Sequence, residues 1–260
     1  MKNLSIKNRL FLFCAVLFSA VCNYNNAVAQ QPAGIKNIVL VHGAFVDGSG
    51  WKPVYDILVK KGYHVSVTQQ PLTSFDGDVA AVKRILAMQN GPCILVGHSY
   101  GGAIITVAGN DAHVAGLVYI AAHAPDNGES EGGNGKLYPS AYKSLKKGSD
   151  GFDYIAPESF AADFAADLPK AVAEFTANAQ MPAADAVFHA IIQNPAWRVK
   201  PSWYMVAKAD RIINPNLERI YAKRAKSYTV EIEGASHSVY ESHPKEVAEL
   251  IIKAANNALK

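Results

Sequence analysis

Short apolar runs alternate along the chain with segments whose apolar positions recur at helical spacing. At 76–89, for example, Val79, Val82, Ile85 and Leu86 make one apolar stripe, which is typical of a helix packed on a core. The patterns predict strands at 37–41, 63–67, 92–96, 114–121, 202–207 and 228–232, and helices at 51–61, 76–89, 101–109, 216–225 and 244–258. Buried strands that alternate with helices indicate an α/β protein with a mainly parallel sheet covered on both faces.

The alternation breaks between Pro125 and Trp197. This stretch shows no strong strand pattern, and it holds a Gly-rich loop at 128–135 followed by short pieces rich in Ala and Phe. A long insertion within a regular sheet predicts a helical cap, at about 125–197, over an active site. The alternative is a helical subdomain without a role in function.

The N-terminus has the features of a secretory signal peptide. Three basic residues precede an apolar run from Leu10 to Val21, and the small residues Ala27 and Ala29 follow it. We predict cleavage before Gln30, which leaves a single domain at 30–260 that is periplasmic or secreted. A retained anchor is the alternative, but about a dozen apolar residues are too few to cross a bilayer of roughly 30 Å.

Composition favours an ordinary globular domain with a small-molecule partner. Of the 260 residues, 50% are hydrophobic and 18% are charged. Loss of residues 1–29 removes three basic residues, so the formal charge falls from +3 to 0 (25 minus 3 basic against 22 acidic). A neutral chain gives no reason to expect binding to nucleic acid or to an anionic membrane.

The cysteine and histidine patterns give no indication of a disulfide, a metal or a cofactor. Cys14 and Cys22 lie in the predicted signal, so Cys93 remains alone, in an apolar strand where a buried, inert thiol is expected rather than a nucleophile. The histidines are scattered, and the Gly-rich stretch does not join a strand to a helix as a phosphate-binding loop would.

A nucleophile is predicted at Ser99, in the run Gly97-His98-Ser99-Tyr100-Gly101. The run matches G-x-S-x-G, and it lies between a predicted strand and a predicted helix. A sharp turn at this junction exposes the serine hydroxyl above the sheet, and the glycines let the helix pass close to the strand.

A serine hydroxyl needs a base, and the base needs a group that orients it. We predict His237 as the base, because it lies in the loop between the last strand and the last helix; His243 is the rival and is better explained as a solvated or capping residue. For the acid, Asp210 follows the strand at 202–207, and Asp126, after the preceding strand, is the alternative.

Two backbone N–H groups are expected to form an oxyanion hole. One belongs to Tyr100, and the other to Ala44 in the loop His42-Gly43-Ala44-Phe45, with Phe45 as second choice. His42 is expected to hydrogen-bond the loop backbone, and His98 to be a pocket-side neighbour of the nucleophile rather than a proton carrier.

These motifs together resemble the α/β-hydrolase superfamily over essentially all of 30–260. Gly50-Trp51 and the stretch 97–102 are similar to small bacterial esterases related to plant methylesterases and hydroxynitrile lyases. The resemblance implies the α/β-hydrolase fold with a helical cap, the triad Ser99, Asp210 and His237, and the donors Ala44 and Tyr100. Lyases of this branch carry Thr and Lys where this chain has Gly43 and Ser238, which disfavours lyase activity. Dehalogenases and epoxide hydrolases use Asp as the nucleophile, so Ser99 argues against them.

The main hypothesis is a carboxylesterase that needs no cofactor or metal. Aromatic residues of the cap would favour an apolar or aromatic substrate if they face inward, or else they pack the cap itself: Phe152, Tyr154, Phe160, Phe164, Phe175, Phe188 and Trp197. A ligand-binding protein with this fold is the alternative, and so is other acyl chemistry, such as lactone opening, perhydrolysis or C–C cleavage, on the same triad.

Overall fold

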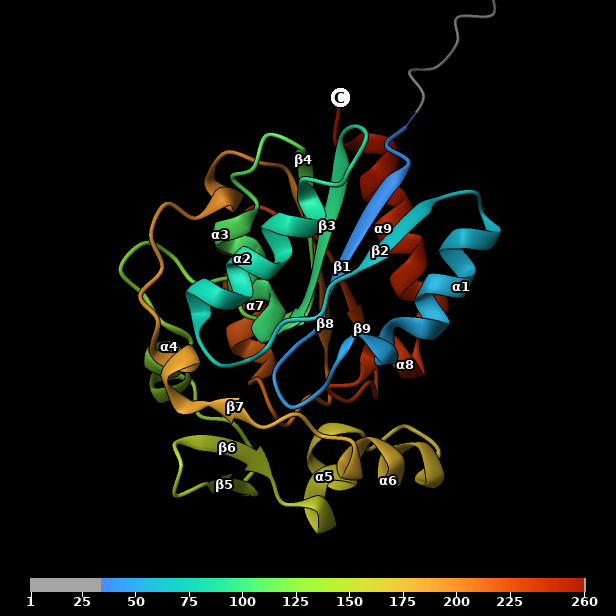
Figure 1. Cartoon of the computed structure of the whole chain (residues 1–260). Coiled ribbons are helices and arrows are strands. Elements are labelled where there is room, and N and C mark those ends of the chain that lie inside the picture. The colour runs from blue at the N-terminus through green and yellow to red at the C-terminus, as the bar shows by residue number, and fades with distance from the viewer. Residues whose placement is uncertain (1–33, 260) are drawn as a thin grey trace, which may run out of the picture. The chain divides into compact units, whose positions relative to one another are not determined.

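A six-stranded parallel sheet dominates the computed structural model, which describes residues 34–259 (Figure 1). The strand order is β2-β1-β3-β4-β8-β9. The strands are β1 (Asn37–Val41), β2 (His64–Val67), β3 (Cys93–Ser99), β4 (Val114–Ala122), β8 (Ser202–Ala207) and β9 (Tyr228–Ile232). All six predicted strands are present, and the parallel α/β architecture is confirmed.

Helices pack on both faces of this sheet. The elements are η1 (Gly48–Trp51), α1 (Lys52–Lys60), α2 (Phe75–Leu86), α3 (Tyr100–Ala108), α7 (Pro215–Arg224), α8 (Val239–Ser242) and α9 (Pro244–Asn257). Figure 1 shows α2, α3 and α7 on one face and α1, α8 and α9 on the other. Successive side chains of a strand enter opposite cores, so Val39 packs beneath α2 and α3 whereas Leu40 packs beneath α1 and α9. This explains why the central strands are apolar throughout.

The segment 125–197 contains strands that the sequence pattern did not predict. It folds into α4 (Glu131–Leu137), β5 (Leu145–Lys147), β6 (Phe152–Ile155), α5 (Pro157–Phe164), α6 (Lys170–Asn178), β7 (Ala183–Ala184), η2 (Asp185–His189) and η3 (Ala196–Arg198). β5, β6 and β7 form a small antiparallel sheet, so the expectation of no strand here was wrong. Strands this short are below the length at which an alternating pattern is recognisable. The predicted Gly-rich loop is also partly helical, because the Ser130 hydroxyl caps α4 by accepting from the N–H of Gly133.

Backbone hydrogen bonds tie this cap segment to the loops at the carboxyl edge of the main sheet. The N–H of Met181 donates to the carbonyl of Phe45, and the N–H of Ser238 donates to the carbonyl of Phe164. In Figure 1 the cap elements β5, β6, α5 and α6 accordingly lie beyond that edge. The cap therefore covers the place where ligands bind in parallel α/β sheets.

The predicted signal peptide, 1–29, lies outside the described residues and stays a prediction. Within 34–259, no helix is both long and apolar enough to cross a membrane. Cys93 is fully buried, and burial raises the pKa of its thiol to about 12, as expected for an inert thiol.

Candidate active site

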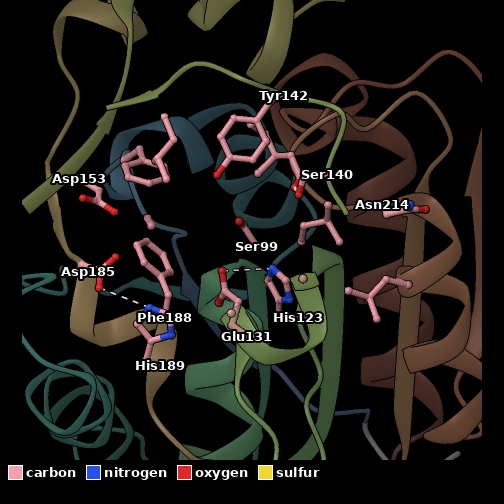
Figure 2. Close-up of a pocket in the computed structure, with 18 of the residues that line it drawn as sticks. Ser99, His123, Glu131, Ser140, Tyr142, Asp153, Asp185, Phe188, His189 and Asn214 are labelled. Atoms are coloured by element: carbon pink, nitrogen blue, oxygen red, sulfur yellow. Dashed lines mark hydrogen bonds and ion pairs between the residues drawn. The ribbon is translucent and has the colours of Figure 1, made fainter. Parts of the chain in front are cut away.

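Ser99 occupies a strained turn between β3 and α3. Its backbone has φ 54° and ψ −126°, a conformation that costs energy for any residue with a side chain. The turn is possible only because glycines flank it. A Cβ on Gly97 would lie 2.6 Å from the carbonyl oxygen of Gly101, and a Cβ on Gly101 would lie 2.6 Å from that of His42. The close packing of strand and helix therefore holds Ser99 in this conformation, and its side chain lines a cavity (Figure 2).

His237 and Asp210 meet although they are 27 positions apart. The Nδ1 of His237 is 2.6 Å from Oδ2 of Asp210, and both side chains are fully buried. The other oxygen, Oδ1, accepts the N–H groups of Ile212 (2.7 Å) and Ile213 (2.9 Å). A carboxylate held in this way keeps the proton of His237 on Nδ1, which leaves the Nε2 lone pair free to accept a proton. Among the described residues, Nε2 of His237 has no hydrogen-bond partner, so it forms no hydrogen bond with Ser99 in this structure.

His98, next to Ser99, hydrogen-bonds the loop that contains His237. Its Nε2–H donates to the carbonyl oxygen of His237 at 2.9 Å, and the two imidazole rings lie 4.7 Å apart. Tyr240 and Phe164 also pack against the His98 ring. Burial, together with the nearby His237, holds the pKa of His98 well below its usual range, so the ring is neutral. The prediction that His98 is no proton carrier fits this geometry, but its predicted pocket-side location is wrong, because it is enclosed beneath the cap.

A second buried carboxyl group, on Glu218 of α7, lies against Asp210. Glu218 is inaccessible to solvent, and its Oε2 accepts the N–H of Ala207 at 3.2 Å. Burial, and then the neighbouring charge of Asp210, raises the pKa of Glu218 well above its ordinary value. Two adjacent carboxyl groups cannot both ionise cheaply, so Glu218 carries a proton and shares it in a hydrogen bond with Asp210. We therefore expect Glu218 to act as a positioning residue for Asp210, the predicted orienting acid.

We expect Glu218→Leu to lower kcat for ester hydrolysis by roughly 10- to 100-fold with little change in KM, because a lost hydrogen bond to a charged group corresponds to about 1.5–3 kcal/mol. Glu218→Gln should restore most of the activity, since its amide group can donate to Asp210 and accept from Ala207. Steady-state kinetics of the two variants, with thermal unfolding of each, makes the comparison. Equal kcat in folded Leu and Gln variants would contradict this role.

The two predicted oxyanion donors flank Ser99. Tyr100 is the first residue of α3, where backbone N–H groups have no partner within the helix. Ala44 and Phe45 line the cavity beside Ser99, and neither donates its N–H to another described residue. His42 is structural, as predicted: its Nδ1–H donates to the carbonyl of Gly43 (2.8 Å) and its Nε2 accepts from the N–H of Gln70 (3.1 Å).

Asp126 and His243, the alternative candidates for the acid and the base, contact other side chains. Asp126 forms an ion pair with Arg198, with an N–O distance of 2.7 Å, and does not contact His237. His243 precedes α9 and lies 3.5 Å from Asp167, but its side chain makes no capping hydrogen bond. The geometry therefore favours Asp210 over Asp126 and His237 over His243.

The cavity in front of Ser99 has a volume of about 230 Å³ and largely apolar walls. Of the seven cap aromatics considered from the sequence, only Phe188 lines it. Phe160 and Phe164 are buried in the cap, whereas Phe175 is 70% exposed. The other aromatic and larger apolar side chains of the wall had not been predicted to contact the substrate: Phe45, Tyr138, Tyr142, Leu145, Ile212, Ile213 and Leu217.

Sequence reasoning also missed three buried polar residues at this site, His123, Glu131 and Glu218. Each lies in a segment without a recognisable motif, although His123 comes two residues after the predicted strand 114–121 and so could have been placed at the carboxyl edge of the sheet. No group of three or more His, Cys, Asp or Glu side chains within 34–259 could hold a metal ion.

Known proteins share this architecture. The model of the alpha/beta hydrolase family matches residues 38–250. Similar solved structures include a pyrethroid hydrolase from Sphingobium faniae, with 23% identity and a TM-score of 0.72 over 86% of this chain and 98% of that one. The structure of polyneuridine aldehyde esterase has 17% identity and a TM-score of 0.71, and the match covers 84% of this chain and 98% of that one. A methylesterase from Arabidopsis has 18% identity and a TM-score of 0.70, and the match covers 85% of this chain and 98% of that one.

At these identities the structural likeness establishes the fold, and it agrees with the resemblance to plant methylesterases noted from the sequence. Among curated proteins, none matches the chain. The family match, however, extends from β1 into α9 and so includes the strained turn at Ser99, the Asp210 turn and the His237 loop. The chain therefore belongs to the alpha/beta hydrolase family.

Proposed function

We propose that this protein is a serine carboxylesterase with Ser99 as its nucleophile. The observation that carries the proposal is the strained backbone of Ser99 at the end of β3, with its side chain on the cavity wall. A protein that only binds ligands gains nothing from a strained serine, whereas a nucleophile must be exposed and fixed in direction.

In the proposed mechanism, His237 Nε2 takes the proton of Ser99 as Oγ attacks the ester carbonyl, and it then passes that proton to the leaving alcohol. Asp210 holds the imidazole by its Nδ1–H and stabilises the cation that forms. The backbone N–H groups of Ala44 and Tyr100 stabilise the oxyanion. Water, activated by His237, then hydrolyses the acyl-enzyme and regenerates Ser99.

The cavity favours a small ester with an apolar or aromatic group. Burial of such a group against the aromatic and aliphatic side chains of the wall favours binding. The cavity volume of about 230 Å³ limits the size of the part that enters. The names of the similar structures, a pyrethroid hydrolase and two esterases, support an ester rather than an amide or a halide as the substrate class.

A fluorophosphonate tests this proposal directly. We expect one label per chain, located on Ser99 by peptide mass spectrometry, and parallel loss of p-nitrophenyl butanoate hydrolysis. The same reagent on heat-denatured protein is the control, because an unfolded serine is not activated. A folded protein that takes no label would favour a ligand-binding role for the same cavity.

A further inference from the structure

The cavity contains a polar pair, His123 and Glu131, that the ester mechanism does not use (Figure 2). His123 directly follows β4, and its backbone N–H donates to the carbonyl oxygen of Ser99 at 3.1 Å. Its Nε2 lies 3.2 Å from Oε1 of Glu131, and the two side chains are only 8% and 15% exposed. The pair therefore lies close to Ser99, in a wall that combines apolar side chains with other polar ones, among them Lys147, Asp153 and Asp185.

A chain of hydrogen bonds behind the pair begins at Glu129, which is ionised. Partial burial opposes its charge, but hydrogen bonds from Arg224, from the Asp126 backbone and from Asn134 lower the pKa of Glu129 to about 2. An ionised carboxylate only accepts hydrogen bonds, so the NH₂ of Asn134 must face it, at 2.8 Å. The same NH₂ group donates to the hydroxyl of Tyr221 at 3.0 Å.

This arrangement sets the protonation of His123. The Tyr221 hydroxyl accepts from Asn134, so its own hydrogen points to Nδ1 of His123, 3.3 Å away. Burial, with the nearby His237, lowers the pKa of His123 to about 3, so the ring is neutral. Its single proton then resides on Nε2, which lies 3.2 Å from Oε1 of Glu131.

The carboxyl group of Glu131 consequently carries a hydrogen-bond donor that has no acceptor among the described residues. Burial raises the pKa of its carboxyl group to about 8, so the neutral acid predominates at pH 7. The protonated Nε2 of His123 lies next to Oε1, which favours Oε2 as the site of the acidic proton. That oxygen is buried and has no hydrogen-bond partner among the described residues. An unsatisfied buried donor destabilises the protein, and a bound ligand that accepts its hydrogen bond can remove that cost.

We propose that Glu131 is a substrate-binding residue, whose carboxylic acid donates a hydrogen bond to a neutral oxygen acceptor that the ester carries close to its scissile group. Ether, ketone and hydroxyl oxygens have this chemistry. The terminal torsion of a glutamate is soft, and a rotation that moves both carboxyl oxygens together can bring the O–H to the cavity. The inference rests on the proposed esterase function and narrows its substrate class.

Pairs of esters that differ by one oxygen test this inference. p-Nitrophenyl methoxyacetate and p-nitrophenyl butanoate differ in the acyl chain, and 2-methoxyethyl butanoate and butyl butanoate differ in the alcohol. The measured quantity is the ratio of kcat/KM within each pair. In at least one pair we expect Glu131→Leu to lower this ratio roughly 10- to 100-fold, the range for a lost hydrogen bond to substrate. Glu131→Gln, which keeps a donor, should largely retain it.

Glu174→Leu, an exposed acid on α6, is the matched control and should leave both ratios unchanged. If folded Glu131→Leu hydrolyses all four esters with wild-type ratios, the inference is wrong and the esterase proposal stands. If the wild type hydrolyses none, the esterase proposal fails instead.

A spectroscopic test of the donor does not depend on turnover. Infrared difference spectra of Ser99→Ala against Ser99→Ala/Glu131→Gln at pH 7 should contain a protonated carboxylic acid band. That band should shift when 1,2-dimethoxyethane is added and stay unchanged with hexane. Absence of the band, or an identical response to both compounds, would overturn the inference even in an inactive protein.

Discussion

Replacement of Ser99 by alanine is expected to lower kcat for ester hydrolysis by a factor of order 10⁶, the loss found when the nucleophile of a comparable triad is removed. The variant loses the covalent route and keeps only substrate binding and the oxyanion hole. His237→Ala should lose nearly as much, and the double variant little more, because the residues act as one unit. Burst and steady-state kinetics with p-nitrophenyl butanoate measure all three.

The fold should survive Ser99→Ala, since the change removes one hydroxyl from a cavity wall and no core packing. Ser227→Ala is a suitable control, because that hydroxyl bonds Ser202 at the opposite end of β8 and β9. Esterase activity that persists in a folded Ser99→Ala variant would exclude Ser99 as the nucleophile.

Asp210→Asn is expected to lower kcat by about 10⁴-fold, the effect of the same change in a comparable triad. Asparagine can still accept the N–H groups of Ile212 and Ile213 through its oxygen, so the turn should keep its shape. Its NH₂ group, however, would face Nδ1 of His237 and favour the tautomer with the proton on Nε2. That tautomer cannot take the proton of Ser99.

Asp126→Asn is the matched control for this change. Its carboxylate pairs with Arg198 on the surface, so we expect kcat within about twofold of wild type and a stability change below about 0.5 kcal/mol. Comparison of kcat for the two variants decides between the two acids. Near-normal turnover in Asp210→Asn with a large loss in Asp126→Asn would reverse the assignment.

The sequence by itself determined the main sheet and the strand–turn–helix motif at Ser99, the predicted nucleophile. Strands 37–41, 202–207 and 228–232 have the predicted bounds. The first two are buried and mostly apolar, the last is a more exposed edge strand rich in β-branched and aromatic residues, and turn residues follow all three. The turn at Ser99 could also be predicted from the sequence, since a strand, two glycines and a helix in succession are local features. Asp210 and His237 followed from chain order, and the structure brings these two together at 2.6 Å.

Only the tertiary structure decided which polar groups share the buried site. The contact of Glu218 with Asp210 joins a helix to a turn, and that of His123 with Glu131 joins a strand end to the cap. The cap itself was predicted without its strands. Such contacts depend on how separate elements pack, and burial, neighbouring charges and hydrogen bonds together then decide which side chains keep a proton. A linear pattern of apolar and polar residues records neither the packing nor the local dielectric, so it cannot specify these pairs.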